Sequence, residues 1–159
     1  KNVLIVIKGG YLLITLILLS SMITSVEGWL IVTTPISFLG VHPATRVPFT
    51  YFITLQAIVV GALYKRRNVK PFLAFMGVAS LVLLNIYSVN DNLVLHNIFA
   101  ILFFLVQPII FFLEYRNKKD TYSLSKGAVL IFLALLTWLG IIPLPIFEVI
   151  AYALLILFL

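Results

Sequence analysis

Long apolar runs alternate with short polar segments along almost the whole chain. The runs lie at about 3–26, 47–64, 71–89, 93–113, 127–142 and 146–159. An α-helix rises about 1.5 Å per residue, so roughly 20 apolar residues cross the hydrocarbon core of a bilayer. We therefore predict an all-α polytopic membrane protein, in which residues 1–159 form a single transmembrane domain with a six-helix bundle.

The last run, 146–159, is short because Pro143 and Pro145 break the apolar stretch before it. A run of about 14 residues covers roughly 21 Å, less than the hydrocarbon core of about 30 Å. We expect a sixth helix whose final turns lie beyond this chain, or a helix in a thinned region of the bilayer. A re-entrant hairpin is the less favoured alternative.

The polar segments differ in character. Residues 65–70 form a basic turn, residues 90–92 a polar turn, and residues 114–126 the longest hydrophilic loop. Residues 27–46 are interpreted as an outer cap, an extended piece with a turn, because a residue that precedes proline is pushed towards extended geometry. Gly40, within this cap, suits a turn with positive φ.

Composition agrees with a membrane protein. Hydrophobic residues make up 63% of the chain and charged residues 10%, against about half and a quarter in soluble proteins. With a mean hydropathy of +1.20, the chain has too little polar surface to cover a soluble globule. The absence of cysteine excludes disulfides, thiolate metal sites and thiol chemistry.

The basic residues predict the orientation, because lysine and arginine collect in the cytoplasmic loops of membrane proteins. Six spans place ten of the 11 basic residues on one side and Arg46 on the other. We therefore place both termini in the cytoplasm, 27–46 outside, and the protein in the plasma (cell) membrane. The net charge of +6 belongs to these turns, so no nucleic-acid partner is expected. The ten residues are Lys1, Lys8, Lys65, Arg66, Arg67, Lys70, Arg116, Lys118, Lys119 and Lys126.

The outer side then collects the residues that could carry chemistry, which are Glu27, His42, Arg46, Asp91, His96 and Glu148. The two histidines and one of the acids could form a metal site with three protein ligands and an open position. Their spacing matches no established metal motif, and a haem held by both imidazoles is a further alternative. We expect hydrogen-bonded structural histidines instead, and we predict no cofactor.

Arg46 is the single cation expected outside. The favoured interpretation is an ion pair with Glu27, Asp91 or Glu148. The alternative is a ligand-binding site with Arg46, Glu27 and Ser37, because a guanidinium binds phosphate or carboxylate through two hydrogen bonds. Glu148 is expected to cap the positive end of the last helix, and a general acid or base role beside a histidine is its alternative.

Three amides lie inside the second, third and fourth runs, at Gln56, Asn85 and Gln107. Side chains of this kind hydrogen-bond between membrane helices. A transporter would need a series of acids at mid-membrane depth. The runs contain no such series, so transport is disfavoured.

Three short motifs resemble those of the Frag1/DRAM/Sfk1 proteins and the similar DUF998 membrane proteins. They are Pro35-Ile36-Ser37-Phe38-Leu39-Gly40, Leu95-His96-Asn97-Ile98-Phe99-Ala100 and Phe147-Glu148. Phe38 stands where the family has aspartate, so no role of that acid carries over. The resemblance implies a six-helix bundle capped by outer loops, in a family linked to lipid-anchor remodelling, autophagy regulation and membrane organisation.

The function that these features predict is non-catalytic. We expect an integral membrane protein that binds lipid or membrane-protein partners, for example as an accessory subunit of a larger membrane complex. The alternative is a membrane-embedded hydrolase or transferase that acts on a lipid at the outer interface. It would use His42 and His96 with Glu148 or Asp91, and Arg46 to hold an anion.

Overall fold

The computed structural model describes residues 2–27, 34 and 36–158, and residues 2–7 by their backbone alone. Within these ranges the chain is all-helical, which confirms the all-α part of the predicted fold class. The elements are α1 (Asn2–Thr24), a 3-10 helix η1 (Ile36–Gly40), α2 (Arg46–Arg66), α3 (Pro71–Ile86), α4 (Leu93–Lys118), α5 (Thr121–Trp138) and α6 (Leu144–Phe158).

Three of these helices, α2, α4 and α5, are long and apolar enough to cross a membrane. The remaining apolar segments are shorter, and they are Lys8–Thr24 of α1, α3 and α6. At about 1.5 Å per residue, the 16 residues of α3 span about 24 Å, somewhat less than a typical hydrocarbon core.

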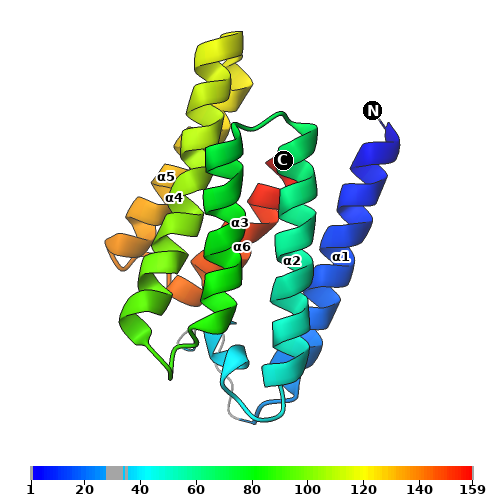
Figure 1. Cartoon of the computed structure of the whole chain (residues 1–159), viewed down its shortest axis with the longest axis vertical. Helices are drawn as coiled ribbons and strands as arrows, with labels where there is room; N and C mark the ends of the chain where they lie inside the picture. The colour runs from blue at the N-terminus through cyan, green and yellow to red at the C-terminus, as the bar shows by residue number, and fades with distance from the viewer. Residues whose placement is uncertain (1, 28–33, 35, 159) are drawn as a thin grey trace.

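The helices follow one another in space as well as in sequence. Close contacts run from α2 to α3, from α3 to α4, from α4 to α5, and from α5 to α6, and α6 also contacts α1. The two end members of this series, α1 and α2, lie side by side, and the Tyr11 hydroxyl of α1 donates to Oε1 of Gln56 in α2 (Figure 1). The turns that join α2 to α3 and α4 to α5 lie at the same end of the bundle as the N-terminus, and η1 lies at the opposite end (Figure 1).

The segment 114–126, predicted to be a loop, is mostly helical. α4 continues to Lys118, α5 begins at Thr121, and only a tight turn with Lys119 at φ 55° separates them. Two local interactions explain why the helices extend into this segment. Lys118 pairs with Glu114 one helical turn earlier, at 2.8 Å. Asp120 caps α5, because its side chain accepts the backbone N–H of Tyr122, the second residue of the helix, at 3.1 Å.

The cap also differs from its prediction. Residues 36–40, expected to be extended, form η1, and Gly40 does not have positive φ; of the described glycines, Gly140 does. Gly40 serves close packing instead, because a Cβ there would lie 3.0 Å from Cδ1 of Phe49. The buried Thr45 hydroxyl donates to the Leu39 carbonyl at 2.8 Å and so fixes η1 onto the start of α2. Residues 28–33 and Pro35 of the predicted cap lie outside the described residues.

Tyr64 organises the centre of the bundle. Its side chain is fully buried, and its hydroxyl donates to Oε1 of Gln107 at 2.7 Å, which links α2 to α4. The ring lies against Gly77 of α3, where an added Cβ would come within 2.6 Å of the Tyr64 hydroxyl and 2.8 Å of the ring. Gln107 thus makes the interhelical hydrogen bond that its position predicts.

We expect Gly77→Ala to lower the free energy of unfolding by about 1–3 kcal/mol, because the added methyl overpacks a core with no room for it. The measurement is denaturant-induced unfolding in detergent micelles. Gly61→Ala in α2 is the control, since its new Cβ would make an ordinary contact of 3.4 Å with Val78. Equal effects of the two variants would contradict this account of the α2–α3 interface.

Candidate functional site

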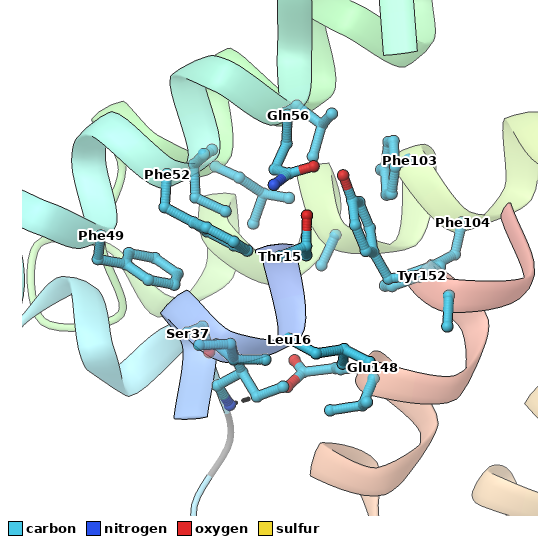
Figure 2. A pocket seen from close by; sticks show the side chains of 18 of the residues that line it. Thr15, Leu16, Ser37, Phe49, Phe52, Gln56, Phe103, Phe104, Glu148 and Tyr152 are labelled. Carbon is cyan, nitrogen blue, oxygen red and sulfur yellow. Dashed lines mark hydrogen bonds between the residues drawn. The ribbon is translucent and has the colours of Figure 1, made fainter. Parts of the chain in front are cut away.

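An apolar cavity of about 120 Å³ lies inside the bundle on the side of η1. Residues of α1, η1, α2, α3, α4 and α6 line it, and most of them are leucine, isoleucine, valine, phenylalanine or alanine. Figure 2 shows a polar minority at two places in this apolar surface. The polar lining residues are Thr15, Ser37, Gln56, His96, Glu148 and Tyr152.

At the η1 side of the cavity, Glu148 holds the first residue of η1. Its Oε2 accepts a hydrogen bond from the backbone N–H of Ile36 at 2.9 Å, and the neighbouring Ser37 also lines the cavity (Figure 2). The prediction that Glu148 caps its own helix is wrong. α6 begins at Leu144 and has no acid in its first turn. The Glu148 side chain instead accepts a hydrogen bond from a backbone N–H of the cap.

Deeper in the cavity, three hydroxyl or amide side chains converge. Thr15 of α1, Gln56 of α2 and Tyr152 of α6 direct their polar ends towards one region (Figure 2). Tyr11 lies beside them, and its hydroxyl donates to Oε1 of Gln56. The Tyr152 hydroxyl lies near that of Tyr11, yet its buried oxygen has no hydrogen-bond partner in the described part of the chain.

Sequence reasoning did not identify Thr15 and Tyr152 as site residues. A signal was present, because Tyr11 and Thr15 are four residues apart, as are Glu148 and Tyr152. Side chains with that spacing lie on one face of a helix. The spacing could not show that the two faces, on α1 and α6, meet each other.

The two histidines lie in different environments. His96 is 7% exposed, lines the cavity, and has its Nδ1 2.9 Å from the Tyr87 carbonyl oxygen at the end of α3. His42 lies in a separate groove with Glu27, and its Nδ1 accepts the backbone N–H of Ala44 at 3.3 Å. Of the predicted candidates, the structure therefore brings His96, Glu148 and Ser37 to one cavity and leaves His42 and Glu27 outside it.

No group of three or more histidine, aspartate or glutamate side chains gathers at metal-binding distance among the residues that the structure describes. The arrangement that a metal site with His42, His96 and an acid would require is therefore not found in that part of the chain. The cavity contains one imidazole and one carboxyl group, from His96 and Glu148.

Arg46 does not form the expected ion pair. Its side chain is exposed at the start of α2, and within the described ranges no carboxylate lies within 4.0 Å of it. Arg46 interacts electrostatically with Asp91 over a longer distance. The exposed Asp91 accepts a hydrogen bond from the Ser88 hydroxyl at 2.5 Å, and this bond, supported by Arg46, lowers the pKa of the Asp91 carboxyl below its ordinary value of 3.8.

No protein-family model, curated protein or solved structure matches this chain. The resemblance to the Frag1/DRAM/Sfk1 and DUF998 proteins stays a prediction. The function must therefore be argued from the cavity and its surroundings.

We expect Glu148→Ala to lower the free energy of local unfolding of η1 by about 1–3 kcal/mol, because the Ile36 N–H would lose its acceptor. Hydrogen exchange of the backbone amides in 36–40, measured by mass spectrometry, should become faster. Glu148→Gln keeps an acceptor oxygen and should have a smaller effect, and Glu27→Ala, an exposed acid elsewhere in the cap, should have none. Unchanged exchange in Glu148→Ala would show that this hydrogen bond does not hold η1.

Proposed function

We propose that this protein is a six-span integral membrane protein that binds a lipid, without catalysis, in the cavity beneath its outer cap. Three helices long and apolar enough to cross a membrane support membrane insertion. The shorter α3 and α6 fit a locally thinned bilayer, at a modest cost per ångström of mismatch. The accessory-subunit role and the plasma membrane location remain predictions of the sequence.

The distribution of charge supports the orientation with both termini in the cytoplasm. Lys8 lies within electrostatic range of Arg66 and Arg67, and Lys126 within range of Lys8 and Arg67. The side chains of Lys8 and Lys126 donate to the carbonyl oxygens of Leu157 and Phe158, at 3.4 and 3.2 Å. These basic residues therefore gather at one end of the bundle, as cytoplasmic residues of membrane proteins do.

The observation that carries the lipid-binding proposal is the cavity itself. Binding sites for small apolar ligands are concave, mostly apolar, and carry a few polar groups that orient the ligand. The cavity has this character: aliphatic and aromatic side chains supply most of its wall, and its polar groups lie at two places. An engineered apolar cavity of about 150 Å³ binds benzene, so this cavity has room for part of a lipid rather than for a whole one.

The alternative, a hydrolase or transferase at the outer interface, would need its acid–base groups together. General acid–base catalysis requires groups within hydrogen-bond reach of the reacting atoms. His42 lies in a different groove from His96 and Glu148, and Arg46 and Asp91 do not line the cavity that those two share. Nothing in this arrangement favours the enzyme over the binding protein.

We expect Ala153→Phe to reduce lipid that co-purifies with the protein, because the new ring would fill the cavity from α6. The measurement is native mass spectrometry of protein released from nanodiscs. Ala62→Phe is the matched control, since Ala62 is exposed on α2 and does not line the cavity. The same lipid retention in both variants would argue against the cavity as the binding site.

The orientation can be tested with single cysteines, because the chain has none of its own. In intact cells, a membrane-impermeant maleimide should label Ala44→Cys in the cap and leave Asn117→Cys, near the end of α4, unlabelled until the cells are permeabilised. Both native side chains are exposed. Labelling of Asn117→Cys in intact cells would show that the orientation or the number of spans is wrong.

A further inference from the structure

The described residues that line the cavity include no lysine or arginine. They do include the carboxyl group of Glu148 and the imidazole of His96. An ion buried in a site of low dielectric needs a partner of opposite charge. A phosphate or carboxylate headgroup would meet Glu148 with no cation to balance it, so the lining disfavours anionic lipids.

The deeper polar group offers hydrogen bonds instead. The buried hydroxyl of Tyr152 has no partner in the described chain, and a buried polar group left unpaired costs free energy. Thr15 and Gln56 direct their polar ends to the same region (Figure 2). A ligand that brings one small, uncharged polar group to this place would give the Tyr152 hydroxyl a hydrogen-bond partner without burying an ion.

A groove on the outside of the bundle adjoins the cavity at Phe52. It lies between α1 and α2, has a volume of about 470 Å³, and is lined by residues such as Leu18, Met22 and Leu55. Phe52 lines both this groove and the cavity, so its ring separates them. The groove is larger than the cavity and mostly apolar, which suits the hydrocarbon chain of a lipid.

We infer that the ligand is an uncharged lipid with a hydroxyl group, bound with the hydroxyl among Thr15, Gln56 and Tyr152 and the hydrocarbon chain directed past Phe52 into the groove between α1 and α2. The inference rests on the lipid binding proposed above and adds the chemical class of the lipid. Tyr152 donates a hydrogen bond to the oxygen of the ligand. The ligand hydroxyl in turn donates to an oxygen of Thr15 or Gln56.

Three photoreactive probes with the same ten-carbon chain test this inference: an alcohol, a carboxylate and an ammonium. Each is added to the full chain in phosphatidylcholine nanodiscs and activated, and labelled peptides of α1 and α6 are quantified by mass spectrometry. Labelling of the lipid-facing surface of α4 corrects for differences in partitioning. We expect the alcohol to label the cavity peptides most strongly. Excess unlabelled decanol should compete for the site and reduce this labelling.

Tyr152→Phe should reduce labelling by the alcohol about five- to tenfold, as expected when one hydrogen bond in an apolar site is lost. It should leave labelling by the other two probes unchanged. This variant removes only a hydroxyl that has no partner in the described chain, so folding should be preserved. Tyr122→Phe, at a residue 63% exposed on α5, is the matched control.

The outcomes separate the inference from the proposal on which it rests. Strongest labelling by the ammonium probe would indicate pairing with Glu148 and overturn the inference, as would equal labelling by the three probes or an unchanged result in Tyr152→Phe. In each of these cases lipid binding in the cavity would stand. Absence of labelling of the cavity peptides by all three probes would overturn lipid binding itself.

Discussion

The need to satisfy polar groups without water governs this structure. In hydrocarbon, backbone N–H and C=O groups must find partners within the chain, and a helix provides nearly all of them. The side chains follow the same rule where helices meet. Tyr64 bonds to Gln107, Tyr11 to Gln56, and Glu148 to the N–H of Ile36. These three contacts link α2 to α4, α1 to α2, and α6 to η1.

The cavity follows from the way in which α1 completes the bundle. Helices α2 to α5 pack in sequence, and α1 joins them by its contacts with α6. Where α2 meets α3, Tyr64 packs against Gly77 with no room for an added Cβ. Between α1 and α2 the polar link from Tyr11 to Gln56 spans the gap, with the cavity on one side of Phe52 and the open groove on the other. Neither Tyr64 nor Gly77 lines the cavity or the groove, so a ligand at this junction would leave their packing unchanged.

The charged residues divide between the two ends. At the basic end, Glu114 accepts from both Arg67 and Lys118, and Lys126 lies over the rings of Phe111, Tyr122 and Phe158. These contacts moderate the repulsion among many cations, and two lysines also meet the negative carboxyl end of α6. At the other end the charges stand further apart, and Glu148 turns inward to hold η1. Among the described residues of the cap, hydrogen bonds and not ion pairs make the contacts that hold η1.

The sequence by itself determined the all-helical fold and the approximate position of each helix, because apolar runs of this length have few other stable structures. It also singled out Glu148, His96 and Ser37 as candidates, because polar residues are rare in this chain, and the structure places these three at one cavity. It misjudged the segment 114–126, where capping by Asp120 and the pair of Glu114 with Lys118 extend the helices.

Only the tertiary structure decided which polar residues meet. The faces of α1 and α6 that carry Thr15 and Tyr152 come together through packing between helices distant in the chain. His42 lies in a separate groove. Spacing along the sequence records the face of a helix on which a residue lies, and it does not record which other helix that face will contact.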